Sequence, residues 1–435
     1  MKKQTRKTLA NAIAKDSDKQ YFCPLPFEHL YSDSAGRWRL CCRAYPFEHT
    51  VSDTTPEEHW DHEKMREIRR EMLTGDLKLT RKHCWKCLKV EREGLTSARQ
   101  QLNNKILDRA AAGKRSRTLD YAAVMANSGD TSALPEERVL ELKLRIFGNY
   151  CNLRCYMCAP VNSTSRHQEI AEIRDGRWFD CLKPPEKMEF FDNEEDYDRF
   201  VDSAIRMLPS VKKIKITGGE PFLLRRHYKF IEKVVATEHA SEIRLSYDSN
   251  MTKFQLGSSN VLDYLGKFKG VTVAVSVDDI GPRNDYIRYG ANFDEVIANI
   301  KTAREMPGIN VVVSCATGML NAGDVHDIAQ YFHDIGIVAK FNMCVITGPT
   351  FLQARHLPDE LKKRYLAQIE DSPRREQFAN VIKMIKQPRD EKEFQTFLEY
   401  IGDLDVHRGT SLLDLWPEFE PYVREATAAV PAATE

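Results

Sequence analysis

Six short runs rich in β-branched and other apolar residues recur along the middle of the chain and predict β-strands. They cover residues 139–147, 211–217, 243–249, 271–277, 309–317 and 339–347. Segments with apolar residues at helical spacing lie between them, at 163–173, 225–237, 258–267, 292–305 and 323–334. Such alternation is typical of parallel βα units. Six units are too few for a closed eight-stranded barrel, so we expect an α/β fold with an open, partial (β/α)6 barrel. Its active site should lie at the C-terminal ends of the strands.

The chain on either side of this region has different patterns. Residues 1–20 predict a flexible polar tail, and residues 21–105 include a helix in which Trp60, Met65, Ile68 and Met72 share one face and Gly75 ends it. Residues 106–137 are polar and rich in Gly, Ser and Asp, which indicates a linker before a barrel at 138–350. Residues 351–435 predict a helical C-terminal extension, with helical patterns at 358–371, 375–386 and 390–401.

Composition and charge narrow the classes of function. The 435 residues, 42% hydrophobic and 29% charged, suffice for one large domain and one or two smaller ones. Lys+Arg and Asp+Glu number 64 each, so no basic field favours nucleic acid as a partner. No run of about 18 apolar residues predicts a membrane span, and the N-terminus lacks the apolar segment of a secretory signal. We therefore expect a cytoplasmic protein without a membrane partner.

Cysteine usage changes this picture most. The 11 cysteines are an odd number in a chain without a secretory signal, which indicates metal binding or thiol chemistry rather than a disulfide framework. Five of them lie in the first hundred residues and three form one tight run after the first predicted strand. Cys315 and Cys344 stand apart, inside strand-like runs, and we expect both to be buried as small hydrophobic residues.

The tight run consists of Cys151, Cys155 and Cys158, separated by three and two residues. Thiolates on such a short loop suit three irons of a [4Fe–4S] cube and leave the fourth iron open to an outside ligand. A zinc knuckle, with His167 as the fourth ligand, is the alternative.

The second predicted strand ends in Thr217, followed by Gly218, Gly219, Glu220 and Pro221. The three-cysteine run and this GGEP turn, at the ends of successive strands, resemble the radical S-adenosylmethionine (SAM) superfamily. The resemblance implies that SAM chelates the open iron, and that its reductive cleavage yields a 5′-deoxyadenosyl radical which abstracts a substrate hydrogen. It also implies that Gly218, Gly219, Glu220 and Pro221 receive the methionine amine of SAM. One departure is Met157 before the third cysteine, where the family usually has an aromatic residue.

The same resemblance implies further SAM contacts at the ends of later strands. The residues concerned are Ser246, Asn250, Ser276, Asp278, Arg288 and the backbone around Val345 and Ile346. Each polar side chain among them has capping or turn formation as its alternative role.

The first cysteine group has a second recognisable spacing. It resembles a shortened SPASM-type module, called a twitch domain, here placed before the barrel. This implies an auxiliary [4Fe–4S] cluster, for which a zinc site is the alternative. Cys42 is the alternative to Cys41 as a ligand. The expected ligands are Cys23, Cys41, Cys84 and Cys87, with Gly36 five residues before Cys41.

Three functional hypotheses follow from these motifs. The first is a radical SAM enzyme that modifies a peptide or protein side chain. The second is the same chemistry on a small molecule such as a nucleotide or sugar. The third is a non-catalytic iron–sulfur or zinc scaffold, which the SAM-type turn makes the least favoured. Either enzyme would need a low-potential electron donor such as flavodoxin or ferredoxin.

Overall fold

The computed structural model of the chain describes residues 21–92, 94, 96–112, 139–182, 190–337 and 341–428. The expected tail at 1–20, most of the expected linker at 106–137 and the end of the expected C-terminal extension lie outside the described residues. No helix in the described ranges combines the length and the apolar character needed to cross a bilayer.

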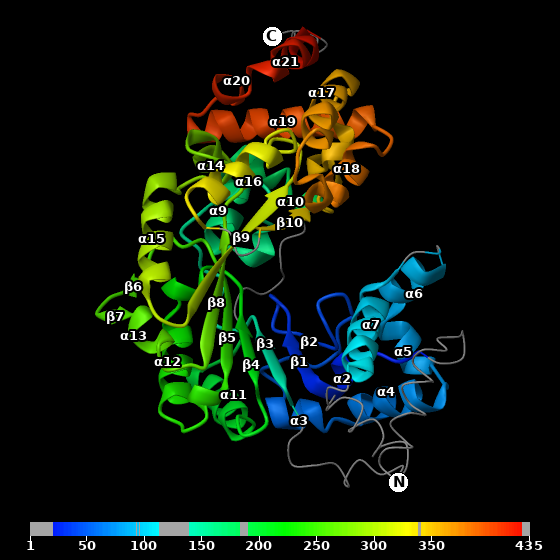
Figure 1. Cartoon of the computed structure of the whole chain (residues 1–435), viewed down its shortest axis with the longest axis vertical. Coiled ribbons are helices and arrows are strands. Elements are labelled where there is room, and N and C mark those ends of the chain that lie inside the picture. Colours follow the sequence, from blue (N-terminus) through cyan, green and yellow to red (C-terminus); the bar gives the residue numbers. More distant parts are fainter. Residues whose placement is uncertain are drawn as a thin grey trace.

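An eight-stranded sheet forms the centre of the molecule (Figure 1), in the order β10-β9-β8-β5-β4-β3-β1-β2. The six strands expected from the sequence are all present and pair in parallel with their neighbours. This gives the α/β fold with a mostly parallel sheet that a partial barrel requires. The strands are β3 (Glu141–Leu144), β4 (Lys213–Ile216), β5 (Arg244–Ser249), β8 (Gly270–Ser276), β9 (Ile309–Thr317) and β10 (Phe341–Val345).

Strand side chains alternate between the helix-covered face and the inner face of the curved sheet. On β3, Leu142 and Leu144 are fully buried in the main core, whereas Lys143 between them is partly exposed. Ile214 and Ile216 of β4 repeat this pattern around Lys215. Polar residues of these strands therefore face the inside of the barrel.

Four of the five predicted helical segments form helices, namely α9 (Thr164–Glu172), α12 (Arg225–Val235), α15 (Phe293–Glu305) and α16 (Val325–Asp334). The structure adds α10 (Phe179–Leu182), α11 (Glu194–Arg206) and α14 (Pro282–Ile287), which the sequence analysis did not predict. The expectation of a helix over 258–267 is wrong. That stretch begins with the hairpin of β6 (Gln255–Leu256) and β7 (Ser259–Asn260), followed by the short α13 (Leu262–Leu265). Gly257 has a φ of 61° and starts the two-residue turn between β6 and β7. A positive φ is typical of such hairpin turns and does not occur inside a regular helix.

The N-terminal part joins the barrel sheet directly. Strand β1 (His29–Ser32) pairs in parallel with β3, and β2 (Trp38–Arg39) adds to β1 in the antiparallel sense. The helices that accompany them are α2 (Leu25–Glu28), α3 (Pro56–Trp60), α4 (Glu63–Thr74), α5 (Lys78–His83), α6 (Trp85–Arg92) and α7 (Ala98–Ala111). The predicted helix through Trp60 and Met72 is thus two helices, because His62 caps α4 by accepting from the Lys64 amide. Gly75, with a φ of 88°, ends α4 as expected, and α7 extends into the expected linker.

Beyond the barrel, the segments expected to be helical after residue 350 form α17 (Asp359–Glu370), α18 (Ala379–Ile385) and α19 (Glu391–Arg408), followed by α20 (Leu412–Leu415) and α21 (Glu420–Ala428). These helices pack around a second core that they share with barrel residues such as Tyr156, Ile170 and Tyr286, at the end of the sheet where β9 and β10 lie (Figure 1). Cys315 of β9 is fully buried, as expected. The same expectation for Cys344 is wrong, because β10 is the edge strand and leaves this thiol exposed.

Candidate functional site

A cavity of about 280 Å³ opens at the C-terminal ends of the strands, where β3, β4, β5 and β8 end. The three thiols of the tight cysteine run line it. Of the other residues predicted to form the site, Gly218, Gly219, Glu220, Asn250, Ser276 and Arg288 share its wall. Pro221, Ser246, Asp278 and Val345 are absent from this wall. The structure therefore brings both sequence motifs to one cavity.

Two backbone hydrogen bonds, one to the last residue of α14 and one to the segment just after it, hold the loop that carries the three cysteines in place. The amide of Arg154 donates to the carbonyl of Tyr289 (2.9 Å), and the amide of Tyr156 donates to that of Ile287 (3.0 Å). Burial raises the thiol pKa of all three cysteines, to about 12 at Cys158, with neighbouring thiols adding to the effect at Cys151 and Cys158. Metal binding would therefore have to displace their protons.

The Gly-Gly turn after β4 rests directly on the backbone that precedes Cys151. Gly219 has a φ of 51°, and a Cβ atom there would lie 2.3 Å from the carbonyl oxygen of Tyr150. The amide of Glu220 donates to the same oxygen (2.7 Å). Only glycine combines this positive φ with so close an approach, so the turn and the cysteine loop are built against each other.

The Glu220 carboxylate is buried and joins the end of β4 to the end of β5. It accepts hydrogen bonds from the Ser249 hydroxyl (2.8 Å), the Asn250 amide (2.6 Å) and the Phe222 amide (3.3 Å). Burial raises the pKa of Glu220 to about 7, although these donors favour the ionised form. The carboxylate can therefore hold a cation in the cavity while its protein donors keep it oriented.

Arg288 supplies the cation on the other side of the cavity. It is paired with Asp278 at 2.7 Å, and Asp278 also accepts from the amide of Ala316 (2.7 Å). Burial alone would lower the pKa of Arg288, but the Cys155 thiol and the Asp278 carboxylate raise it above its usual value. Asp278 thus orients Arg288 from behind the wall of the cavity.

Nine further residues line the cavity that were not among the predicted site residues. They are Tyr31, Cys42, Lys143, Arg145, Leu153, Asn162, Thr217, Asp248 and Ser249. Strand alternation would have placed Lys143 and Asp248 on the inner face, because each lies between two buried neighbours. Tyr31 and Cys42 come from the N-terminal part of the chain, and only the pairing of β1 with β3 brings them here.

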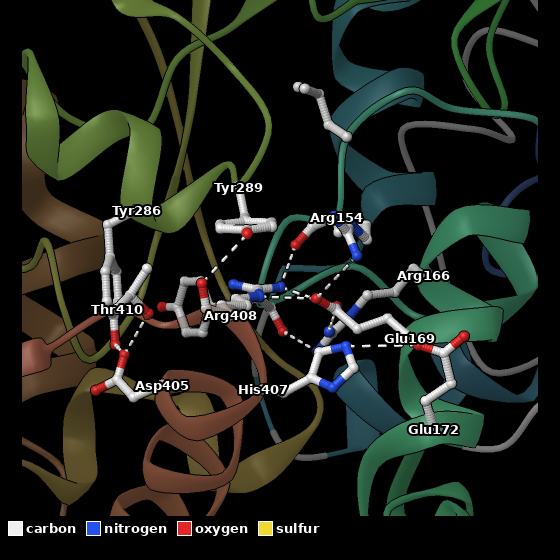
Figure 2. A network of polar contacts seen from close by, with 12 residues as sticks. Arg154, Arg166, Glu169, Glu172, Tyr286, Tyr289, Asp405, His407, Arg408 and Thr410 are labelled. Carbon is white, nitrogen blue, oxygen red and sulfur yellow. Dashed lines mark hydrogen bonds and ion pairs between the residues drawn. The ribbon is translucent and has the colours of Figure 1, made fainter.

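The C-terminal extension contacts the cysteine loop through a buried polar network (Figure 2). Arg408, the last residue of α19, donates to the carbonyl of Arg154 (2.5 Å) and to both carboxylate oxygens of Glu169 (2.8 and 2.9 Å). Its guanidinium also lies 4.5 Å from the centre of the Tyr289 ring. The hydroxyl of Tyr400, earlier on α19, donates to the carbonyl of Tyr156 (2.6 Å). Two residues of α19 therefore hold carbonyls of the loop that carries the three thiols.

The N-terminal cysteines line a second cavity, of about 230 Å³. Burial raises the thiol pKa of Cys84 well above its usual value, and the thiols of Cys23, Cys41 and Cys87 are close enough to raise it further. These are the four thiols expected from the sequence. Cys42 also lines this cavity, but it is exposed and lines the barrel cavity as well. The placement favours Cys41 over Cys42 as the fourth thiol of the group.

The arrangement of the thiols bears on which metal group they fit. Within the described ranges, no three His, Cys, Asp or Glu side chains are arranged to hold a single metal ion. A [4Fe–4S] cube needs no such convergence, because each of its thiolates binds a separate iron. Both thiol-lined cavities fit that requirement. His167, the zinc alternative, packs against Phe179 with ring centroids 5.1 Å apart and is not in the wall of the barrel cavity.

Comparison with known proteins agrees with the sequence motifs. Residues 146–332 match the family described as the radical SAM superfamily. Among curated proteins, the GTP 3′,8-cyclase of Aquifex aeolicus (strain VF5) is 24% identical over 192 residues, covering 44% of this chain and 52% of the cyclase. The GTP 3′,8-cyclase of Desulforamulus reducens is 27% identical, over 44% of this chain and 51% of the cyclase. The chain thus spans about half the length of these curated relatives.

Solved structures with similar folds are more distant. Native anSMEcpe with bound AdoMet is 16% identical with a TM-score of 0.38, over 63% of this chain and 68% of that one. Streptococcus suis SuiB bound to the precursor peptide SuiA is 14% identical with a TM-score of 0.35, over 93% of this chain and 74% of that one.

Proposed function

Since residues 146–332 match the family described as the radical SAM superfamily, we propose that this chain cleaves SAM reductively and uses the resulting radical to abstract a hydrogen atom from its substrate. The observation that supports this most is the single cavity that joins three thiols, the Gly218-Gly219 turn and Glu220. Three thiolates without a fourth protein ligand leave one iron of a cubane available to an outside ligand.

In this proposal Cys151, Cys155 and Cys158 hold the cluster, and the end of β4 receives the methionine amine of SAM. Arg288, oriented by Asp278 at 2.7 Å, binds the carboxylate of SAM from the opposite side. A cluster held here would supply the single electron for reductive cleavage of SAM into methionine and a 5′-deoxyadenosyl radical, and the rest of the cavity would hold the substrate that gives up a hydrogen atom.

The second cavity would hold an auxiliary [4Fe–4S] cluster on Cys23, Cys41, Cys84 and Cys87. Support comes from the mutual proximity of these thiols and from their burial. Arg99 lies in the same wall, where it donates to the carbonyl of Phe22 (3.0 Å) and pairs with Glu91 (2.8 Å). With four thiolates this site would be closed to substrate and suited to electron transfer, with flavodoxin or ferredoxin as the external donor.

For the substrate we favour a peptide or protein side chain. Parts of the chain before and after the barrel both reach the catalytic cavity or its cysteine loop, through Cys42 and through Arg408. These added segments could contact a peptide outside the cavity, whereas a small metabolite needs only the pocket itself. A small metabolite is the second candidate, because the curated relatives carry the name GTP 3′,8-cyclase. Deuterium transfer into 5′-deoxyadenosine from labelled peptides or from labelled nucleotides would separate the two.

Iron content and SAM cleavage test the catalytic assignment. Anaerobically reconstituted protein should hold about eight irons, the sum of two four-iron clusters. The triple variant Cys151→Ala, Cys155→Ala, Cys158→Ala should keep about half of that iron and form no 5′-deoxyadenosine, because the SAM-binding cluster is gone. Production of 5′-deoxyadenosine by this variant would show that the assignment is wrong.

Two single variants provide matched controls. Cys344→Ala removes an exposed thiol from the edge strand β10 and should change neither iron content nor SAM cleavage. Cys84→Ala should release the iron of the N-terminal site alone. Elemental analysis that finds one zinc in place of those irons would contradict the auxiliary cluster and leave the SAM-binding site unaffected.

A further inference from the structure

One lysine in the catalytic cavity has no part in the function proposed so far. Lys143 lies on the inner face of β3, between the buried residues Leu142 and Leu144. Its ammonium group is 5.1 Å from the centre of the Tyr31 ring. Within the described part of the chain no carboxylate forms an ion pair with it, although Asp248 lies in the same region. A half-buried ammonium group without a paired anion costs free energy unless a ligand compensates it.

The neighbours of Lys143 strengthen the positive charge. Lys215 of β4 is the residue paired with Lys143 of β3, and Arg145 lies two residues after Lys143 in the sequence. Asp248 is the carboxylate nearby, and it is already paired with Lys215 at 2.9 Å. Three cationic side chains therefore face one carboxylate. Burial lowers the pKa of Lys143 most, and Lys215 and Arg145 lower it further, whereas Cys42 and Asp248 act in the opposite direction. A bound anion would also favour the charged form of Lys143.

Arg145 has donor capacity left in this part of the cavity. Its Nη2 donates to the Asn162 side chain (2.9 Å). Its Nε is buried and has no hydrogen-bond partner among the described residues. Polar groups buried in this way are normally satisfied by protein, water or ligand.

Lys143 is not among the proposed SAM contacts. The carboxylate of SAM is assigned to Arg288, beyond β8, and the amine to the end of β4, whereas Lys143 lies on β3 next to Tyr31. Arg145 borders both regions, because its Nε is 3.7 Å from the position of a Cβ added to Gly218. The Lys143 side of the cavity remains for the substrate, with Arg145 at its border.

We propose that Lys143 and Arg145 form an anion-binding subsite, and that the substrate carries a phosphate or carboxylate group which binds there. That the bound anion belongs to the substrate rests on the proposed function. The geometry of the subsite does not depend on SAM cleavage. Ammonium and guanidinium groups together suit anionic oxygens, through point charge and directed hydrogen bonds respectively.

Cys42 offers a reporter for this subsite, because its thiol is exposed and lines the same cavity. The rates at which Cys42 reacts with an anionic and with a cationic methanethiosulfonate reagent can be compared on the reconstituted protein by peptide mass spectrometry. The anionic reagent should react faster. Lys143→Gln should lower the ratio of the anionic to the cationic rate about fivefold. This is the size of effect expected when one unit charge, acting across a short water-filled gap, no longer attracts the anionic reagent and repels the cationic one. No turnover is needed, so a failed SAM-cleavage assay leaves this test valid.

Charge-retaining and remote substitutions serve as controls. Lys143→Arg should preserve the ratio, and so should Lys212→Gln, which removes an exposed lysine at the opposite end of β4. Pyrophosphate and glutarate, added separately, test for phosphate and carboxylate binding. At least one of them should slow the labelling of Cys42 in the wild type and lose that effect in Lys143→Gln.

Three results would overturn the proposal. The first is a rate ratio near one in the wild type. The second is labelling that neither pyrophosphate nor glutarate slows. The third is a Cys42 that reacts with neither reagent, because such a thiol would be a metal ligand and not part of the subsite wall.

Discussion

Gly219 is the residue on which the contact between the two motifs depends. A methyl group at this position would meet the carbonyl oxygen of Tyr150 at 2.3 Å and the carbonyl carbon of Asn149 at 2.9 Å. Both atoms belong to the backbone and cannot move without moving the cysteine loop. Gly219→Ala should therefore shift the loop, lower the iron content of the reconstituted protein by up to half and weaken SAM binding at least tenfold. Iron analysis and equilibrium SAM binding measure the two effects.

Gly257 provides the matched control for this substitution. It has a similar positive φ of 61° in the β6–β7 turn, and no atom lies within 4 Å of an added Cβ. Gly257→Ala should cost only the backbone strain of a left-handed alanine, about 1 kcal/mol of stability, with iron content and SAM binding unchanged. Equal loss of iron in both variants would show that strain, and not the Tyr150 contact, is responsible.

At the scale of elements, helix α19 supports the cysteine loop from outside the barrel. Arg408 makes three hydrogen bonds, one to the Arg154 carbonyl and two to the Glu169 carboxylate, and is nearly fully buried. Lysine keeps the charge but cannot reproduce this forked geometry. Arg408→Lys should lower the free energy of unfolding by about 2 kcal/mol or more and speed the extraction of iron from the barrel cluster by a chelator several-fold.

Arg424→Lys is the comparison for that measurement. Arg424 pairs with Glu420 on the exposed surface of α21, where an ion pair contributes at most about 1 kcal/mol. The rate of iron extraction should stay at the wild-type value. If Arg408→Lys behaved in the same way, the extension would not support the loop.

At the scale of the whole molecule, the N-terminal part and the barrel meet at the pairing of β1 with β3. Glu141 of β3 lies 3.6 Å from His29 of β1 and 2.9 Å from Lys213 of β4. Burial alone would raise the pKa of Glu141, but His29 and Lys213 outweigh it and lower it from 4.5 to about 2. The carboxylate therefore contributes stability above about pH 4.5 that is lost as the pH falls toward about 2. His29 adds to this contribution only in its protonated form, whereas Lys213 adds to it as an ordinary ammonium group.

Glu141→Gln tests that contribution. At pH 7 the variant should be less stable by about 1 to 3 kcal/mol, seen as a lower thermal midpoint. The difference from the wild type should shrink as the pH falls below about 4.5. A difference that stays constant from pH 7 to pH 3 would mean that the glutamine acts through packing and not through the lost charge.

Local sequence patterns were enough to predict the fold class and the two motifs that line the barrel cavity. Apolar runs of strand length repeat with helical segments between them, and this local pattern needs no tertiary information. The spacing of Cys151, Cys155 and Cys158 and the Gly218-Gly219 pair are also local, because each belongs to one loop after one strand. The parallel order of β3 and β4 then brings their ends together, so predicting the strands was enough to predict that these motifs meet.

The tertiary structure alone decided which distant residues complete the site. The inner position of Lys143 follows from strand alternation. That no carboxylate among the described residues pairs with it depends on Asp248 pairing with Lys215 across β4 and β5. Cys42 reaches the cavity because β1 adds to the edge of the barrel sheet, a pairing that no local pattern encodes. Arg408 contacts the carbonyl of Arg154 in the cysteine loop, although 254 sequence positions separate the two residues. Such contacts depend on long-range packing, which local patterns do not describe. For the same reason the local pattern wrongly predicted a buried Cys344, because only the sheet order shows that β10 is an edge strand.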